Sequence, residues 1–214
     1  MKRKPLLICS YYTKDTPYQD EVKGFLDSIG RHEKGVSVHL VETVNLKSWH
    51  KNTLYKPMIL KKVVSDFREH TILMLDIDAR LNRSLKNLPS KVYTSDISIY
   101  SNPIRACTPQ CRFTDNCPEI LTGTIFINYS PESIKLLDAW DNRNKSNRYA
   151  IIEQNNLQDV LHTIEGLTIF NLPEEYCSIF DNEFQRKHEP VITHYQASRD
   201  YKYKINGPNY DGEN

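Results

Sequence analysis

The segment from His70 to Leu81, HTILMLDIDARL, decides the fold class of this chain. Its four apolar residues at 72–75 run without alternation into Asp76-Ile77-Asp78. A continuous apolar run of this kind indicates a strand that is buried on both faces of a parallel sheet. Open α/β sheets bind ligands at the carboxyl ends of such strands, so the two aspartates are expected at a binding edge.

The spacing of the two aspartates predicts a metal site. Side chains alternate along an extended segment, so Asp76 and Asp78 are expected to point the same way. Two neighbouring carboxylates repel each other, and a divalent cation with a preference for oxygen ligands, Mg²⁺ or Mn²⁺, relieves that repulsion. The alternative is a strand that simply ends in a polar loop.

Length and composition predict a single globular domain. The chain has 214 residues, of which 39% are hydrophobic and 26% charged, and its net charge of +1 does not favour nucleic acid or membrane binding as a whole. No apolar run approaches the roughly 20 residues needed to span a bilayer, and the run Leu6–Cys9 is too short for a secretory signal. Five cysteines without a signal peptide predict free thiols and a cytoplasmic location, with no membrane partner.

Strand and helix patterns alternate along the chain and predict an α/β fold with a mostly parallel, Rossmann-like sheet flanked by helices. Besides the central strand, the expected strands are Leu6–Cys9, Val36–Val44, Asp96–Tyr100, Leu121–Asn128, Leu167–Leu172 and Val191–His194. The expected helices are Tyr18–Ile29, Met58–Phe67, Pro131–Trp140 and Ile151–His162. The stretch Trp49–Lys56 is expected to be a linker. The chain is expected to be irregular from Tyr201, with the domain drawn over residues 1–204 and a tail over 205–214.

Four segments, in order, resemble the GT-A fold nucleotide-diphospho-sugar glycosyltransferases. They are LLICSYYT, KPMILKKVVSDF leading into LMLDIDA, LTGTIFIN followed later by IIEQNNLQDVL, and VITHYQASRDYK near the C-terminus. The resemblance implies a Mn²⁺ or Mg²⁺ ion held by Asp76, Asp78 and His194, which takes up charge as the diphosphate leaves. The alternative for His194 is a hydrogen-bonded histidine at a strand end.

The same resemblance assigns a donor site for a nucleotide sugar, with a UDP-sugar as the expected donor. It implies that the nucleotide contacts Tyr11, Tyr12, Thr13 and Asp76, and that the donor sugar or phosphates contact Lys56, Ser198, Arg199 and Lys202. Two positions depart from the family pattern, because Ala197 replaces a glycine and Asp200 falls where a lysine is usual. For the lysines, ordinary solvated surface positions are the alternative.

On the acceptor side, the resemblance places Trp49, Asn52, Gly123 and Thr124 in the sugar or acceptor pocket. Glu153 and Gln154, which stand where Asp-Gln is usual, are the implied catalytic residues. Glu153 is expected to orient the acceptor hydroxyl, or to act as general base if the reaction inverts configuration. It could equally cap or solvate its helix.

The acceptor is left open between several classes. The segments SWHKNTLYKP, LDIDA and THYQASRDYK resemble small phage-encoded glycosyltransferases that modify DNA, which implies a hydroxymethylated pyrimidine as acceptor and phage or DNA-modification biology. Basic clusters at Lys2–Lys4, Arg143–Arg148 and Arg199–Lys204 would then contact phosphates. A bacterial glycan or protein is the alternative acceptor. A haloacid dehalogenase-type phosphatase and a non-catalytic nucleotide-sugar binder are alternative functions, although Arg80 stands where that phosphatase motif has Thr or Val.

Cys107, Cys111 and Cys117 form a further cluster. They are interpreted as free thiols, with a zinc site as the alternative, because structural zinc usually requires four ligands at closer spacing.

Overall fold

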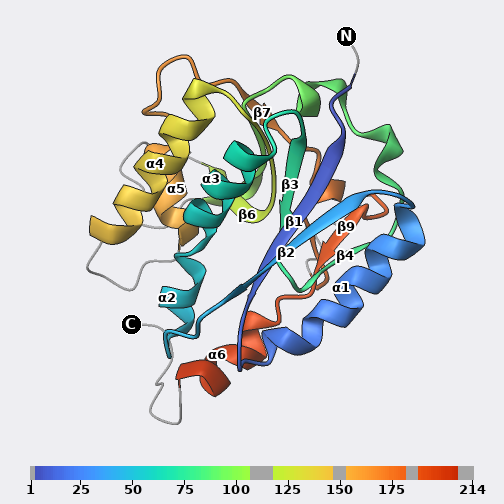
Figure 1. The fold of residues 1–214 in the computed structure, drawn as a ribbon, viewed down its shortest axis with the longest axis vertical. Coiled ribbons are helices and arrows are strands. Elements are labelled where there is room, and N and C mark those ends of the chain that lie inside the picture. Colours follow the sequence, from blue (N-terminus) through green and yellow to red (C-terminus); the bar gives the residue numbers. More distant parts are fainter. Residues whose placement is uncertain (1–2, 107–117, 147–152, 182–187, 207–214) are drawn as a thin grey trace.

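The computed structural model describes residues 3–106, 118–146, 153–181 and 188–206, which form a six-stranded sheet between layers of helices (Figure 1). Its strand order is β2-β1-β3-β6-β5-β7, and a smaller sheet has the order β4-β9-β8. The strands of the large sheet are β1 (Leu6–Thr13), β2 (Ser37–Thr43), β3 (Thr71–Leu75), β5 (Ile97–Ala106), β6 (Pro118–Asn128) and β7 (Ile169–Asn171). Those of the small sheet are β4 (Ala79–Leu81), β8 (Ser178–Ile179) and β9 (Ile192–His194).

The helices alternate with these strands. They are α1 (Tyr18–His32), α2 (Trp49–Thr53), α3 (Lys56–Asp66), α4 (Pro131–Ser146), α5 (Glu153–Leu161) and α6 (Ser198–Asn206), with 3₁₀ turns at Leu85–Asn87, Ser90–Tyr93 and Glu174–Tyr176. Strand β1 pairs in parallel with β2 and β3, and β5 with β7, whereas β6 runs antiparallel to both β3 and β5. The predicted mostly parallel α/β sheet is therefore confirmed, with β6 as its reversed strand among those described.

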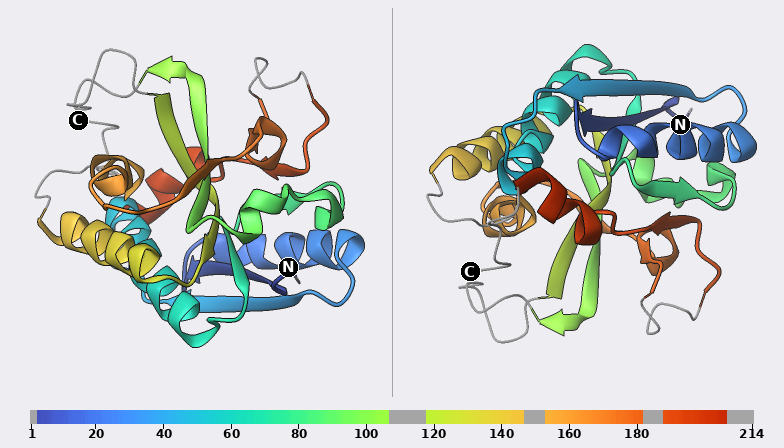
Figure 2. Two further views of the ribbon diagram at one scale, coloured as in Figure 1. Left: turned by 90° about the horizontal axis from the view of Figure 1, so that it is seen from above. Right: turned by 90° about the horizontal axis from the view of Figure 1, so that it is seen from below.

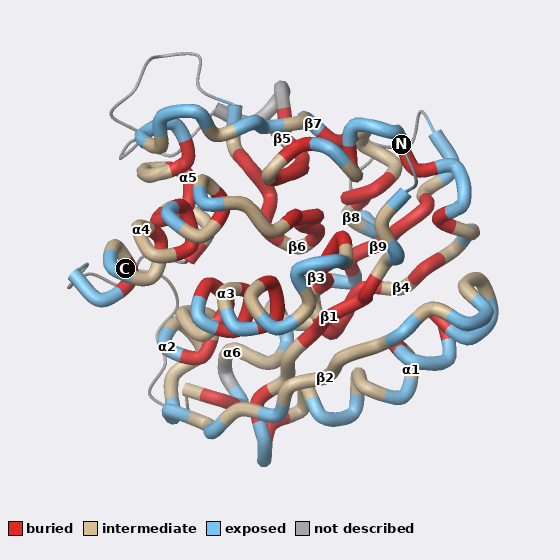
Figure 3. The backbone as a smooth tube through the Cα atoms, turned by 45° about the horizontal axis from the view of Figure 1, so that its top comes forward, coloured by how far each residue is buried: buried red, intermediate tan, exposed pale blue. Residues whose placement is uncertain are grey.

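Strand β3 lies at the centre of two hydrophobic cores, one on each face of the sheet. Leu73 and Leu75 pack in the core that includes Phe25 of α1, whereas Ile72 and Met74 pack in the core that includes Trp140 of α4. The five residues of β3 are all buried, as Figure 3 shows by its red colour. In both views of Figure 2, α1 and α4 lie on opposite sides of the molecule. Burial on both faces explains why the sequence of β3 lacks alternation.

Two segments that were expected to be irregular are helical instead. Residues 49–53 form α2, whose N-terminus is capped by the hydroxyl of Ser48. Residues 198–206 form α6, so the predicted irregularity from Tyr201 is wrong up to residue 206. Ile205 is buried and Tyr201 packs edge-on against the ring of Tyr18, and these tertiary contacts stabilise a helix that its local sequence barely signals.

The remaining expected tail and the cluster of Cys107, Cys111 and Cys117 lie outside the described residues. Within the described part of the chain, Cys9 and Cys177 are free and buried. None of the helices described there has the length and apolar character needed to cross a lipid bilayer.

Asn128 holds the start of β3 in place, and its replacement tests the importance of this anchor. Its side chain accepts a hydrogen bond from the Thr71 hydroxyl at 2.7 Å and donates to the carbonyls of Val92 and Ser95 at 2.9 and 2.7 Å. Asn128→Ala leaves these buried groups unpaired, so we expect a loss of about 3 kcal/mol in the free energy of unfolding, measured by urea denaturation. Lys135→Ala, at an exposed position of α4, is the control and should change stability by less than about 0.5 kcal/mol. Equal stability of the two variants would contradict the assignment.

Candidate active site

The motif Asp76-Ile77-Asp78 forms a tight turn between β3 and β4. The Asp76 amide donates to the carbonyl of Gly123 at 3.0 Å, and the Ala79 amide donates back to the carbonyl of Asp76 at 2.9 Å. Ile77 is buried in the core. The two carboxylates are thus brought together by a turn. The prediction that they lie close together is confirmed, but the reason given for it, the alternation of side chains along an extended strand, is wrong.

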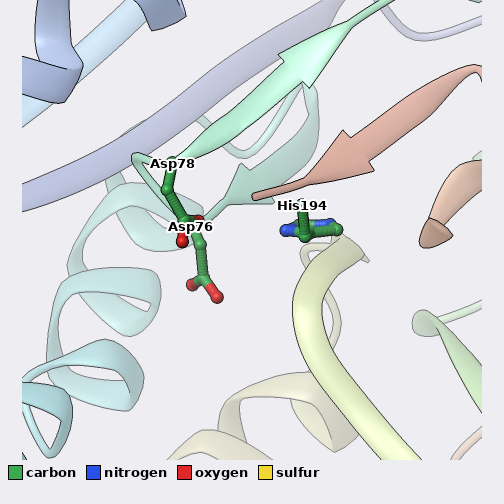
Figure 4. A group of neighbouring side chains, drawn as sticks. All are labelled: Asp76, Asp78 and His194. Carbon is green, nitrogen blue, oxygen red and sulfur yellow. The ribbon is translucent and has the colours of Figure 1, made fainter. Parts of the chain in front are cut away.

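His194 reaches the two aspartates through strand pairing. Strand β4 begins directly after the turn and runs antiparallel to β9, with Ala79 opposite His194. Ligand atoms of Asp76, Asp78 and His194 lie within 4.8 Å of one another, and Figure 4 shows the imidazole at the end of β9 turned toward the carboxylates. Two carboxylates and one imidazole fit a divalent cation such as Mn²⁺ or Mg²⁺. These three residues would hold the ion that the resemblance implies.

The surroundings of this cluster shift the pKa of two of its members. Burial, together with the neighbouring charge of Asp76, raises the pKa of Asp78 to about 7, although the Ala197 amide opposes the shift by donating to Asp78 at 2.8 Å. Burial lowers the pKa of His194 to about 4. The imidazole is therefore neutral at pH 7, which is the form that binds metals.

A single residue of the β6 strand makes room for the imidazole. A Cβ atom added to Gly123 would lie 2.7 Å from Cε1 and 2.8 Å from Nδ1 of His194. The next residue, Thr124, is fully buried, and its hydroxyl lies 2.8 Å from Nε2 of His194. Gly123 and Thr124 were predicted to line a sugar or acceptor pocket, but both contact His194, and only Gly123 lines the cleft. A hydrogen bond to one ring nitrogen fixes the orientation of an imidazole and leaves the other nitrogen for a metal.

Lys56 is buried between two carboxylates. Its ammonium group lies 2.9 Å from Oδ1 of Asp76 and 2.8 Å from Oε1 of Glu153, and it donates to the carbonyl of Thr122 at 3.2 Å. Burial alone would lower the pKa of Lys56, but the carboxylates of Asp76 and Glu153 raise it well above its usual value. Lys56 therefore carries a fixed positive charge beside the group of Asp76, Asp78 and His194.

The two predicted catalytic residues lie at the start of α5. Glu153 is buried, and its Oε1 also accepts a hydrogen bond from the Thr122 hydroxyl at 3.0 Å. Gln154 accepts from the amide of Thr122 at 3.3 Å and donates to Glu119 at 2.9 Å. Both side chains are thus held against β6 in the protein as it stands.

A cleft of about 360 Å³ brings most of the predicted site together. The predicted residues that line it are Tyr11, Tyr12, Thr13, Trp49, Asn52, Lys56, Asp76, Asp78, Gly123, Glu153, Gln154, His194, Ser198 and Lys202. They come from the carboxyl ends of β1 and β3, from β6 and β9, and from four helices. The cleft therefore lies where a mostly parallel sheet is expected to bind its ligand.

The structure does not bring Arg199 into this cleft. Its guanidinium pairs with the carboxylate of Asp181 and lies over the ring of Phe180, so the structure does not support its predicted contact with donor phosphate. Asn52 does line the cleft, but its amide folds the preceding loop, accepting from Leu46 at 2.9 Å and donating to Asn45 at 3.1 Å. Lys202 lies over the Trp49 ring, 4.2 Å from its centroid.

Several cleft residues escaped the sequence analysis: Tyr18, Thr53, Ile77, Glu119, Leu121, Thr122, Cys177, Ile179 and Gln196. Tyr18 accepts a hydrogen bond from the Trp49 indole at 2.9 Å, and its position just after the Tyr11–Thr13 loop was a usable signal. Gln196 has a φ of 56°, a conformation that non-glycine residues adopt rarely. Nothing in its sequence context indicates this backbone conformation.

The raised pKa of Asp78 predicts how the stability of the metal-free protein depends on pH. A carboxyl whose folded pKa of about 7 exceeds its usual value of 3.8 costs stability as the pH rises from about 4 to about 7. Asp78→Asn cannot ionise, and its amide oxygen can still accept from Ala197. In EDTA at pH 8 we therefore expect this variant to be more stable than the natural protein by about 3 kcal/mol, with the difference vanishing near pH 4.

Thermal unfolding across this pH range measures the effect. Excess Mn²⁺ should then raise the Tm of the natural protein but not that of Asp78→Asn, because a ligand stabilises only the state that binds it. A variant that is less stable than the natural protein in EDTA at pH 8 would contradict the environment assigned to Asp78.

Three solved structures share the fold with low sequence identity. A glycosyltransferase involved in the glycosylation of the major capsid of PBCV-1 superposes with a TM-score of 0.66 at 15% identity, over 95% of this chain and 100% of that one. The glycosyltransferase GlyE of Streptococcus pneumoniae TIGR4 gives 0.57 at 13% identity, over 91% of this chain and 55% of that one. Mouse xyloside xylosyltransferase 1 in its apo form gives 0.56 at 12% identity, over 91% and 98%.

Sequence comparison supplies the family. No curated protein sequence matches this chain. The family model described as nucleotide-diphospho-sugar transferase, however, matches residues 28–207 and so includes the DxD turn, Lys56, Glu153 and His194. The chain therefore belongs to the nucleotide-diphospho-sugar transferase family and is a glycosyltransferase.

Proposed function

We propose that this protein is a metal-dependent glycosyltransferase that moves a sugar from a UDP-sugar to an acceptor hydroxyl. The observation that carries the proposal is the meeting of Asp76, Asp78 and His194 in one cleft with the buried cation of Lys56. The positive charges of the proposed divalent ion and of Lys56 suit a leaving group whose negative charge increases as the sugar–phosphate bond breaks.

Each side of the cleft supplies one part of the chemistry. The aromatic side chains of Tyr11, Tyr18 and Trp49 offer surfaces for a nucleobase at the end of β1. Asp76, Asp78 and His194 would hold a Mn²⁺ or Mg²⁺ ion, which would supply Lewis-acid stabilisation of the diphosphate. Ser198 and Lys202 of α6 line the same cleft and offer a hydroxyl and an ammonium group to phosphate oxygens.

Lys56 and Glu153 act as a pair in this proposal. Because the Lys56 ammonium already neutralises Glu153, we infer that Glu153 orients Lys56 rather than acting as general base. Lys56 in turn fixes one oxygen of Asp76, and a carboxylate has further lone pairs for a metal. Gln154 follows Glu153 on α5 and also lines the cleft, and we assign it the contact with a sugar hydroxyl.

Surface charge bears on the acceptor. Three members of the two basic clusters that would contact DNA phosphates are paired within the protein: Arg143 with Asp159, Lys145 with Asp141, and Arg199 with Asp181. Internal pairing leaves less positive charge for counterion release, which dominates DNA affinity. These pairs favour the bacterial glycan or protein as acceptor, and hydroxymethylated pyrimidine DNA becomes the second candidate.

Release of UDP tests the donor half of the proposal. We expect slow hydrolysis of at least one of UDP-glucose, UDP-galactose and UDP-xylose with Mn²⁺, and none in EDTA. Asp76→Asn should lower the rate by roughly 100-fold, because the ion stabilises several kcal/mol of charge in the transition state. Asp66→Asn, at an exposed acid of α3 paired with Lys62, is the matched control and should leave the rate unchanged.

The alternatives give different results in the same assay. A non-catalytic binder shows a thermal shift with UDP-sugars but no UDP release, and metal-independent hydrolysis would overturn the role of the ion. The phosphatase alternative is set aside, because the family match identifies a transferase. Adding an oligosaccharide mixture or duplex DNA with 5-hydroxymethylcytosine, and following label from the donor sugar, separates the two acceptor classes.

A further inference from the structure

Arg80 lies directly behind the metal-binding turn without lining the cleft. Its guanidinium Nη1 donates to the carbonyls of Ile77 at 3.0 Å and of Ala79 at 2.9 Å, the two residues that flank Asp78. Its Nη2 pairs with the carboxylate of Glu21 on α1, and the Arg80 and Glu21 side chains are each only 19% exposed. The backbone around Asp78 is thus fastened to α1 by one side chain.

Helix α1 is shaped to receive this guanidinium. A Cβ atom added to Gly24 would lie 2.6 to 2.9 Å from Nη2, Nε and Cζ of Arg80. Glycine disfavours the interior of a helix, so a glycine at this point of α1 needs a reason, and close approach of Arg80 supplies one. At Gly30 of the same helix, an added Cβ would meet no described atom within 4 Å.

The same glutamate reaches helix α6. Its second oxygen, Oε1, accepts a hydrogen bond from the Tyr201 hydroxyl at 2.9 Å. A separate and direct link joins the turn to the start of α6, where the Ala197 amide donates to Asp78 at 2.8 Å. Since α6 carries Ser198 and Lys202 into the cleft, the turn and the proposed phosphate-binding side are held by one connected set of hydrogen bonds.

We propose that Arg80 and Glu21 are positioning residues that hold the Asp76–Asp78 turn in its metal-binding geometry and couple it, through Tyr201, to the placement of α6. The proposal rests on the proposed metal-dependent function. Two adjacent carboxylates repel each other, which does not stabilise the turn that carries them. Before an ion binds, the geometry of the turn therefore depends on the groups that hydrogen-bond its backbone. Groups that hydrogen-bond metal ligands directly typically change metal affinity by about 10- to 100-fold, and Arg80 acts on the backbone next to one such ligand. Coupling to α6 makes metal and nucleotide binding strengthen each other, and this effect is reciprocal.

The two glycines of α1 provide the test. The dissociation constant for Mn²⁺ alone is measured from the electron paramagnetic resonance signal of the free ion. Gly24→Ala, which displaces Arg80, should raise it about tenfold, whereas Gly30→Ala should leave it within about twofold of the natural protein. Both substitutions add the same methyl group to the same helix, so a difference between them reports on Arg80. Equal Mn²⁺ affinity in the two variants, or no Mn²⁺ binding by the natural protein, would overturn the proposal.

A second pair of variants applies if circular dichroism shows that Gly24→Ala does not fold. Glu21→Gln keeps the shape of the side chain but removes the charge that holds Arg80, and it should also weaken Mn²⁺ binding severalfold. Asp20→Asn, at the neighbouring exposed acid, is its control and should leave Mn²⁺ binding unchanged. The same Mn²⁺ affinity in these two variants would count against the positioning role.

Tyr201→Phe tests the link to α6. It should bind Mn²⁺ alone like the natural protein, but UDP should tighten its Mn²⁺ binding by a smaller factor. An unchanged factor would overturn the coupling. Parallel assays of UDP release separate a failure of the positioning role from a failure of the transferase activity. If UDP is released but the two glycine variants bind Mn²⁺ equally well, only the positioning role is refuted. A clear difference without release refutes only the transferase activity.

Discussion

The concentration of negative charge at the carboxyl end of β3 is the constraint on which the rest of the site depends. Asp78 and Glu153 are buried at this end of the sheet, where a carboxylate would be unstable alone, and Asp76, whose side chain is 40% exposed, adds a third negative charge. The chain compensates part of this charge with Lys56, which it buries between two of the three. Within the described residues Asp78 forms no ion pair, and burial together with the neighbouring charge of Asp76 raises its pKa. A divalent ion at the proposed site would offset that negative charge.

The surrounding elements can be understood as supports for this charge. Strand β6 is antiparallel to its neighbours and places Gly123 and Thr124 at the carboxyl end of β3. There Gly123 leaves space for the His194 ring and the Thr124 hydroxyl lies within hydrogen-bond distance of it. Helix α3 begins at Lys56, which places the ammonium group at the end of the sheet rather than in solvent. Helix α1 holds the turn from behind through Arg80. Few of these groups would contact a substrate, yet they fix the positions of those that would.

The sequence predicted much of this arrangement, and its failures have physical reasons. The unbroken apolar run of β3 and the two aspartates that follow it predicted the fold class and two acids of the candidate metal site, because local pattern and burial agree there. For Lys56 the sequence left an ordinary surface lysine as the alternative to a donor contact. Nothing in the neighbouring sequence reveals that two acids from distant segments enclose its ammonium group. The helical state of residues 201–206 depends on contacts with α1 and α2, which no local propensity encodes. Arg199 pairs with Asp181, a neighbour in space that the spacing of the motif does not reveal, so its contact with donor phosphate stays a prediction.

The antiparallel pairing of β4 with β9 has a consequence for how the protein becomes active during its synthesis. The hydrogen bond between Ala197 and Asp78 closes a loop of 119 residues, and His194 comes from the same late segment. An emerging chain that has already formed β1 and β3 would hold the acids but not the imidazole. Closing so long a loop costs entropy that an ion shared by its two ends would help to offset. Metal binding at the proposed site would therefore stabilise the contacts that form between the early and late parts of the chain.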